Sequence, residues 1–229
     1  MPVPARMPEL PVTPDRLPVL YLHGFASSPE SSKARYFGER LAARGVALST
    51  PDFNAPDFRT LTMSRMLDQL GREIDQAGGR VVLMGSSLGG ALAVLGAARY
   101  GAMVERMVLL APAVMLAKPG HSLLPPERIE AWRHAGSMTF FHYAYGEERL
   151  LDYAFYADSL RHDPDEAVFT QPTLIFQGLR DTIVAPRPVE HFASRRPNVT
   201  LSLLDDDHQL AASLPRMWES VEDFLGLLD

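Results

Sequence analysis

The chain has 229 residues, of which 46% are hydrophobic, and this length allows one sizeable core rather than two large domains. Its net charge of -6 provides no basic surface for DNA, RNA or an anionic membrane, so none of these is expected as a partner. The absence of cysteine excludes disulfides, thiolate nucleophiles and cysteine-ligated metal centres.

Residues 1–18 repeat proline, which removes backbone donors and fixes φ, and they are predicted to form an extended arm. This segment lacks the apolar core of a signal peptide, and no later stretch is long and apolar enough to span a bilayer. We therefore expect a cytoplasmic protein with a single domain over residues 19–229.

Six short apolar runs, each bounded by turn-forming residues, have the length and the β-branched or aliphatic composition of strands. In chain order they are VLYLHG (19–24), VALSTPDF (46–53), VVLMGSS (81–87), MVLLAP (107–112), TLIFQG (173–178) and TLSLLD (200–205). The sequence therefore predicts a sheet of about six strands or more.

Segments with helical periodicity alternate with these runs. The first has an apolar face at Ala34, Phe37 and Leu41 and is predicted to begin near Pro29 and to end at Gly45. Three more are predicted over residues 63–74, over residues 88–100 and after residue 215. Strands alternating with helices indicate an α/β fold with a mostly parallel sheet covered by helices on both faces. Such sheets bind ligands at the carboxyl ends of their strands.

Residues 113–170 interrupt this alternation and are too long for a connecting loop. They are predicted to form an inserted, mostly helical cap. The cap either lines an apolar acyl pocket or uses its large side chains for its own packing. These side chains are Trp132, Met138, Phe140, Phe141, Tyr143, Tyr145, Tyr153, Phe155 and Tyr156.

Two adjacent serines, Ser86 and Ser87, lie between the predicted strand and the following helix. A nucleophilic serine on a sharp strand-to-helix turn needs glycine two residues before and after it, because a Cβ there would crowd the neighbouring backbone. Ser87 has Gly85 and Gly89 at these positions, whereas Ser86 has glycine at neither. We predict that Ser87 is the nucleophile; the alternative is that glycine and serine merely form a turn.

A serine hydroxyl needs a base to become nucleophilic, and the base needs a group that orients it. In enzymes with this turn, an acid and then a histidine follow the serine, each in a loop after a strand. Asp181 follows the run at 173–178, and His208 follows the run at 200–205. The predicted triad is therefore Ser87, Asp181 and His208.

Both partners of the serine have alternative interpretations. Asp181 is also suited to capping the turn before Pro186, and His208 could be an ordinary surface histidine. The acids at 205–207 compete with Asp181, but a carboxylate adjacent to the histidine in sequence is poorly placed to meet its ring Nδ1. We interpret these three acids as a solvated loop that raises the basicity of the imidazole.

The tetrahedral intermediate of acyl transfer requires two hydrogen-bond donors for its negative oxygen. One is predicted to be the backbone N–H of Leu88, the residue after the nucleophile. The other is predicted to be the N–H of Phe25, because Gly24 allows the chain to turn after the first strand. His23 is interpreted as a structural residue of this turn.

The remaining histidines and two nearby cations have less specific patterns. His121, His134, His142, His162 and His191 lack the spacing of a metal site, so we expect surface or packing roles for them, and we predict neither a metal nor a cofactor. Lys33 and Arg35 either attract an anionic substrate group or are solvated charges. We favour solvated charges.

Four stretches, LYLHGFASSPESSKA, GSSLGG, QGLRDTIV and DDDHQL, together resemble the small YqiA-type esterases of the α/β-hydrolase superfamily. The resemblance covers most of residues 19–229, and the first stretch is the most specific for the group. It implies an α/β-hydrolase fold and hydrolysis of carboxylic esters or thioesters by Ser87, Asp181 and His208 without a cofactor. The insertion at 113–170 is longer than is usual in the group, so the substrate is not carried over.

We therefore expect a serine hydrolase that acts on a small-molecule ester through an acyl-enzyme, with esters favoured because their leaving groups need the least help. The alternative is a small-molecule binding protein on the same scaffold, which the fold alone does not distinguish. A correctly ordered triad favours the enzyme, because a receptor has no physical need for one. The sequence specifies neither the acyl group nor the oligomeric state.

Overall fold

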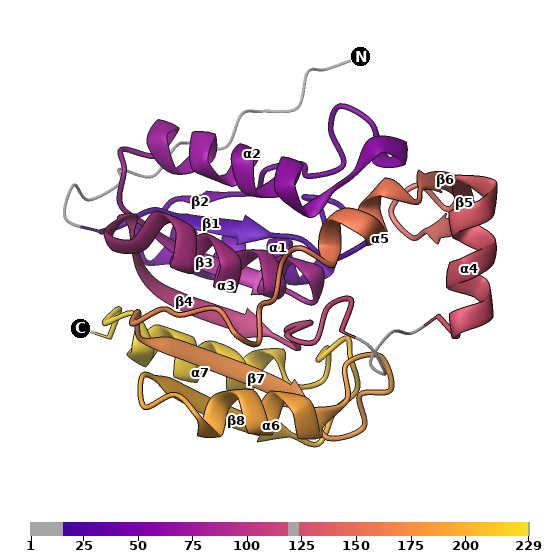
Figure 1. Ribbon diagram of the computed structural model, residues 1–229. Coiled ribbons are helices and arrows are strands. Elements are labelled where there is room, and N and C mark those ends of the chain that lie inside the picture. Colours follow the sequence, from indigo (N-terminus) through magenta and orange to yellow (C-terminus); the bar gives the residue numbers. More distant parts are fainter. Residues whose placement is uncertain (1–15, 119–123, 229) are drawn as a thin grey trace, which may run out of the picture.

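A six-stranded sheet with all strands parallel forms the centre of the protein, in the order β2-β1-β3-β4-β7-β8. The computed structural model describes residues 16–118 and 124–228. Each of the six predicted runs overlaps one of these strands, and Figure 1 shows their arrows pointing toward the same side. The strands are β1 (Val19–Leu22), β2 (Leu48–Ser49), β3 (Val81–Ser86), β4 (Val104–Leu110), β7 (Thr173–Gly178) and β8 (Val199–Leu204).

Helices cover both faces of the sheet, as the alternating pattern predicts. One face packs against α2 (Met63–Gln76), α3 (Leu88–Tyr100) and α6 (Pro186–Ser194), whose buried apolar side chains share one hydrophobic cluster. The other face packs against α1 (Ser32–Ala43) and α7 (Leu214–Phe224), which share a second cluster. The fold is thus a three-layer α/β arrangement in which β3 and β4 are buried at the centre.

The helix boundaries follow from capping side chains and apolar periodicity. The Oγ of Ser31 accepts a hydrogen bond from the N–H of Ala34, so α1 begins after Ser31 rather than at Pro29. Thr62 caps α2 in the same way, by accepting from the N–H of Arg65. The predicted apolar face of α2 is buried; its residues are Met63, Met66, Leu67, Leu70 and Ile74.

The helix α6 was not predicted from the sequence. It begins with Pro186, a residue that suits the first turn of a helix because it lacks an N–H. Val189 and Phe192 are fully buried against the sheet. This helix is too short for its few apolar residues to show a clear helical periodicity in the sequence.

Most of the predicted N-terminal arm, residues 1–15, lies outside the described residues. The remaining part of that arm lies against the domain. Leu17 packs on the cluster that contains α1, and the carbonyl oxygen of Pro18 accepts a hydrogen bond of 2.9 Å from the N–H of Val82. Residues that precede the predicted start of the domain at Val19 therefore already contact it.

In its described residues, the insertion at 113–170 contains the helices α4 (Pro126–Ala135) and α5 (Ala154–Ser159), which cover less of it than the predicted mostly helical cap requires. It also contains an antiparallel hairpin of β5 (Ser137–His142) and β6 (Glu147–Asp152), which the sequence analysis did not predict. The aromatic run of β5 and the left-handed Gly146 in the connecting turn are the signals that could have identified it. In Figure 1 the hairpin and α4 lie on the side toward which the sheet strands point.

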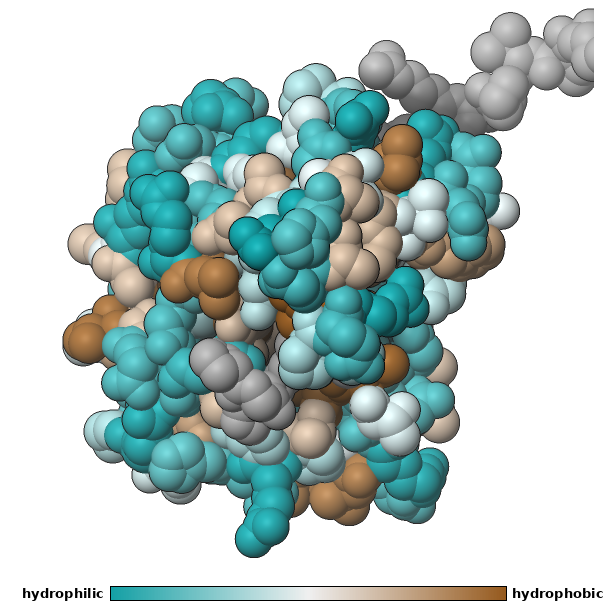
Figure 2. Space-filling model, turned by 45° about the vertical axis from the view of Figure 1, so that its right-hand side comes forward, coloured by the Kyte–Doolittle hydropathy of each residue, from teal (hydrophilic) through white to brown (hydrophobic). Residues whose placement is uncertain are grey.

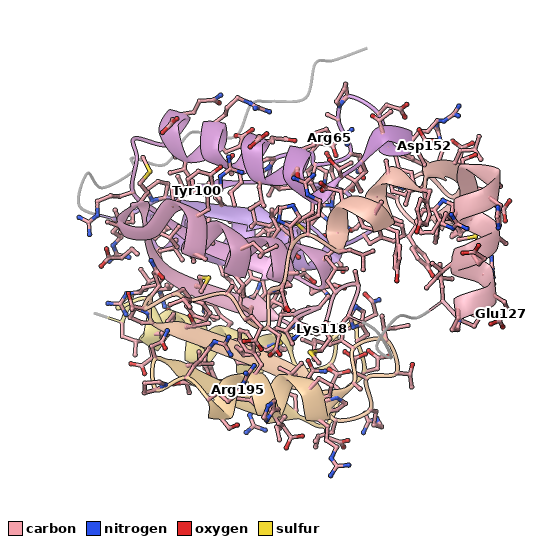
Figure 3. The ribbon with its side chains drawn as sticks, in the orientation of Figure 1. Arg65, Tyr100, Lys118, Glu127, Asp152 and Arg195 are labelled. Carbon is pink, nitrogen blue, oxygen red and sulfur yellow. The ribbon has the colours of Figure 1, made fainter. Side chains whose placement is uncertain are left out.

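Ion pairs fasten the ends of the insertion to the sheet layers. Lys118 and Arg195, both labelled in Figure 3, bind the buried carboxylate of Asp165, with Lys118 Nζ at 2.9 Å from Oδ2. Near the hairpin, the guanidinium of Arg59 donates a hydrogen bond of 2.9 Å to Asp152. Arg195 and Arg59 therefore join the insertion to the rest of the domain.

Figure 2 shows the surface on the side of the insertion, where small hydrophobic patches are separated by hydrophilic residues. The hairpin contributes exposed rings, among them Tyr143, which is 78% exposed. Within the described ranges, none of the helices combines the length and the apolar character needed to traverse a bilayer.

Candidate active site

Strained backbone gathers at the carboxyl ends of the sheet strands. Ala26, Ser87, Ala111 and Leu210 all have φ between 47° and 54°, a conformation that residues with a Cβ rarely adopt. They follow β1, β3, β4 and β8 in turn. Because strain of this kind persists where the surrounding structure enforces it and often marks a functional site, this edge of the sheet is the candidate site.

Ser87 occupies the turn between β3 and α3, with φ 53° and ψ -114°. A Cβ added to Gly85 would stand less than 3.0 Å from the carbonyl of Gly89, and one added to Gly89 would stand less than 3.0 Å from the carbonyl of Leu22. The turn therefore requires glycine at both positions, as predicted, because a Cβ at either one would clash with the backbone. The side chain of Ser87 is half-buried, whereas Ser86 is buried within β3.

A Gly89→Ala variant is expected to lower the free energy of unfolding by about 3 kcal/mol or more, because the added methyl meets main-chain atoms that cannot move aside. The matched control is Gly38→Ala in α1, where the added Cβ would meet only Leu48 Cδ2 at 3.2 Å. That variant should change stability by less than about 1 kcal/mol. Urea unfolding of both variants measures the difference, and equal effects would contradict the crowding at Gly89.

Asp181 lies in the loop after β7 with a fully buried side chain. Its Oδ1 accepts hydrogen bonds of 2.8 Å from the N–H groups of Ile183 and Val184. Its Oδ2 accepts from Nδ1 of His208 at 2.7 Å and from Nε2 of Gln177 at 3.1 Å. The carboxylate thus receives four donors, which hold it in one orientation.

Burial raises the pKa of Asp181, but the hydrogen bonds from His208, Val184 and Ile183 outweigh burial and hold this pKa below its ordinary value. Asp181 is therefore ionised at neutral pH and accepts the Nδ1–H of His208. This assignment leaves Nε2 of His208 without a proton and able to accept one. The His208 side chain is 15% exposed, so the imidazole is mostly shielded from water.

The structure joins two of the three predicted triad residues directly. Asp181 and His208 form a hydrogen-bonded pair, while the Oγ of Ser87 has no hydrogen-bond partner among the described residues. Ser87 and Asp181 follow strands that are separated only by β4, a spacing of about 10 Å. All three residues therefore lie at one edge of the sheet, and a contact between Ser87 and His208 is not formed in this structure.

The two predicted oxyanion donors have backbone N–H groups that bond to no acceptor within the described part of the chain. Leu88 is the first residue of α3, so its N–H lies outside the intrahelical pattern. Phe25 follows Gly24, where an added Cβ would lie 3.5 Å from the Cβ of Ser87. The loop that carries Phe25 therefore adjoins the serine.

His23 is a buried structural residue of this loop, as the sequence suggested. Its Nε2 accepts a hydrogen bond of 3.0 Å from the N–H of Phe53, and its Nδ1 lies 2.9 Å from the carbonyl oxygen of Gly24. Because both ring nitrogens are used in this way, His23 has no nitrogen left to act as a second base.

The acids that precede His208 differ from one another, and the expectation of a solvated loop is wrong for one of them. Asp205 is exposed and forms an ion pair with Arg180. Asp206 is only 6% exposed, and its carboxylate accepts from the N–H groups of Asp207 and Ser213. Asp206 therefore shapes the histidine loop rather than facing solvent.

The expectation that Lys33 is a solvated charge is also wrong. Lys33 is 8% exposed, and its Nζ donates hydrogen bonds to the carbonyl oxygens of Gln209 and His208 at 3.0 and 3.4 Å. Arg35, two residues further along α1, is exposed as expected. The difference arises because Lys33 lies on the helix face that packs toward the histidine loop.

Gln177 is a site residue that the sequence analysis missed. It is fully buried, and its Nε2 donates to Asp181 and to the carbonyl oxygen of Val184 at 2.9 Å. The signal was present in the sequence, because a polar residue near the end of an otherwise apolar strand requires partners when it is buried.

Four of the other histidines take surface or packing roles, and His121 lies outside the described residues. His142 is buried and stacks on Tyr145 with ring centroids 3.9 Å apart. His162 lies 2.9 Å from the Oγ of Ser64, at the contact between α2 and α5. Within the described ranges, no group of three or more histidine or acidic side chains is arranged to hold a metal ion.

Some aromatic residues of the insertion pack the insertion itself, and others contact the loop after β1. Trp132 is 3% exposed and donates a hydrogen bond of 2.9 Å to the carbonyl oxygen of Leu151, so it packs the insertion itself. Phe140 and Phe155 contact the ring of Phe25, with centroids 5.4 and 5.6 Å away. The insertion therefore rests on the loop that carries the predicted oxyanion donor.

Comparisons with known proteins agree with this architecture. A model of an uncharacterised protein family, UPF0227, matches residues 18–225. None of the curated proteins searched matches the sequence.

Solved structures with similar folds include several hydrolases. Est1E from Butyrivibrio proteoclasticus with ferulic acid bound is 23% identical, with a TM-score of 0.80 over 93% of this chain and 89% of that chain. Mouse alpha/beta hydrolase domain-containing protein 10 is 22% identical, with a TM-score of 0.78 over 96% and 93% of the two chains. The monoacylglycerol lipase of Paleococcus ferrophilus is 15% identical, with a TM-score of 0.74 over 92% and 95%. These likenesses show that the chain has the α/β-hydrolase fold.

Proposed function

Because this chain belongs to the UPF0227 family and has the α/β-hydrolase fold, we propose that it is a serine hydrolase that cleaves carboxylic esters, and thioesters as a second class, through an acyl-enzyme on Ser87. The observation that carries the proposal is the strained, glycine-enclosed turn at Ser87, because it places a serine hydroxyl on the sharp strand-to-helix turn that serine hydrolases of this fold use for their nucleophile.

In the first half of the reaction, Ser87 Oγ attacks the carbonyl carbon of the ester while Nε2 of His208 takes its proton. Asp181 holds the resulting imidazolium through the hydrogen bond to Nδ1, which is 2.7 Å long in this structure. The mechanism requires that Ser87 and His208 approach to hydrogen-bond distance when substrate binds.

The negative oxygen of the tetrahedral intermediate would be bound by the N–H groups of Phe25 and Leu88. As the intermediate collapses, the bond to the alcohol or thiol breaks, and His208 returns the proton to this leaving group. His208 then takes a proton from water, whose oxygen attacks the acyl carbon. The bond between this carbon and Ser87 Oγ breaks, His208 returns the proton to Oγ, and the carboxylic acid leaves.

Esters are the preferred class for two reasons. Alcohol leaving groups need less protonation than amines. In addition, one of the similar structures holds ferulic acid, a carboxylic acid, and another is described as a monoacylglycerol lipase. The partly buried rings of Phe25 and Phe140 provide apolar surface close to the predicted oxyanion donor. This surface suits an apolar or aromatic acyl group.

The purified protein is expected to hydrolyse short-chain nitrophenyl esters and to be labelled at Ser87 by a serine-directed fluorophosphonate, because both reactions need only an activated serine and an oxyanion site. Spectrophotometric release of nitrophenol and peptide mass spectrometry of the labelled protein measure the two. A protein that binds these esters without turnover and without labelling would instead be a small-molecule binding protein.

A further inference from the structure

Lys33 is an unusual residue because it is a buried lysine in the first turn of α1. Lysine is almost never buried unless it is paired. Its Nζ forms no ion pair with a carboxylate in the part of the chain that the structure describes. Its hydrogen bonds go to two main-chain carbonyl groups, those of His208 and Gln209, which are 175 and 176 residues further along the chain.

The loop that Lys33 binds contains the predicted catalytic base. On its ring side, His208 is held by Asp181 through Nδ1. On its main-chain side, the carbonyl of the same residue accepts from Lys33. Leu210, two residues later, has φ 54°, so this loop is held in a strained conformation that needs support from its surroundings.

Lys33 also belongs to the element that follows the predicted oxyanion loop. The segment from Gly24 to Ser31 connects β1 to α1, and Gly24 lies beside the side chain of Ser87. One lysine side chain therefore joins the helix after the Phe25 loop to the loop of His208. A contact of this kind fixes the imidazole relative to the other parts of the site.

We propose that Lys33 is a positioning residue for His208: its buried amino group holds the main chain of the histidine loop so that Nε2 of the imidazole faces Ser87. This inference rests on the proposed function, since it assigns Lys33 a part in the same reaction.

The surroundings of Lys33 make this support dependent on pH. Burial lowers the pKa of Lys33 to about 8, and the nearby carboxylates of Asp181, Asp207 and Asp206 only partly oppose this effect. Besides Asp206 and Asp207, the titratable groups on the loop are the imidazole of His208 and the exposed carboxylate of Asp205. Above this pKa the ammonium becomes an amine, whose hydrogen bonds to the two carbonyls are weaker than those of a charged donor. We therefore expect kcat/KM to fall on the alkaline side of about pH 8.

The test compares Lys33→Met, which keeps the length of the side chain and removes its donors, with Arg35→Met on the exposed face of the same helix. With a nitrophenyl ester at pH 7, the first variant is expected to lower kcat/KM by about 100-fold, mainly through kcat, because the base is displaced. The control variant should leave kcat/KM unchanged. Circular dichroism and urea unfolding establish that both variants are folded.

A Lys33→Arg variant separates positioning from a purely structural role. The guanidinium keeps the charge and the donors but does not lose its proton below about pH 12. Its activity near neutral pH should exceed that of Lys33→Met, and its alkaline decline should disappear. This variant also provides the test if Lys33→Met does not fold.

The position of His208 can be read without turnover from the downfield proton resonance of its Nδ1–H, assigned by its loss in His208→Gln. This resonance should broaden or vanish in Lys33→Met and persist in Arg35→Met. A Lys33→Met protein with an unchanged resonance, or with kcat/KM within about threefold of the wild-type value, overturns the inference. Absence of turnover and of fluorophosphonate labelling in the wild-type protein contradicts the proposed function instead, and the resonance still decides the role of Lys33.

Discussion

Replacement of Ser87 by alanine is expected to lower kcat for a nitrophenyl ester by about 10⁶-fold, because it removes the only atom that forms the acyl-enzyme in the proposed mechanism. Covalent labelling by the fluorophosphonate should disappear as well. Alanine keeps the Cβ of serine, so the strain at φ 53° remains and stability should be nearly unchanged. Steady-state kinetics, mass spectrometry and urea unfolding of the variant measure these three outcomes.

The matched control for this variant is Ser86→Ala. Ser86 is the adjacent serine, but it is buried in β3 and lacks the flanking glycines that the turn requires. This change should leave labelling intact and lower kcat by less than about tenfold, since Ser86 does not reach the substrate. If Ser86→Ala abolishes labelling and Ser87→Ala does not, the nucleophile is assigned to the wrong serine.

Asp181→Asn is expected to lower kcat by about 10⁴-fold while the fold is retained. The reason lies in the donors around the carboxylate. Oδ1 accepts from two backbone N–H groups, at Ile183 and Val184, so the amide oxygen of asparagine must take that position. The amide NH₂ then faces His208 Nδ1 and forces the proton onto Nε2, the atom that must accept a proton from Ser87.

The control is Asp205→Asn, because Asp205 is the nearby acid with a side chain that is 82% exposed. It should reduce kcat by less than about threefold, since it removes only a surface ion pair with Arg180. Nitrogen NMR of the imidazole provides an independent measurement, since the protonated nitrogen should change from Nδ1 to Nε2 only in Asp181→Asn. If Asp205→Asn were the more severe variant, the acid of the triad would be in the histidine loop.

The parts of the fold that were predicted correctly have strong local signals. The six sheet strands and the helices α1, α2, α3 and α7 all overlap the predicted segments, because each has an apolar run or period of its own. The missed elements have weaker local signals. α6 is short, and half of the strand residues in the β5–β6 hairpin are exposed, so neither element has a continuous apolar pattern in the sequence.

Local sequence patterns also made part of the candidate site predictable. The spacing of Gly85, Ser87 and Gly89 is a local requirement of one turn, and the structure shows the crowding that explains it. The order of Asp181 and His208 along the chain, each after a strand, indicated their shared edge of the sheet, and their hydrogen bond agrees with the prediction. Their catalytic roles remain predictions that the variants above test.

The amino-acid sequence by itself determined the α/β class, the parallel sheet and the turn that carries Ser87, because these depend on the periodicity and sterics of neighbouring residues. Only the tertiary structure decided that Lys33 is buried and bonded to the loop of His208, and that Gln177 supports Asp181. Burial and partners depend on which distant segments meet. Parallel strands bring such segments together at one edge, and a lysine on α1 has the same local sequence signal whether it faces water or that edge.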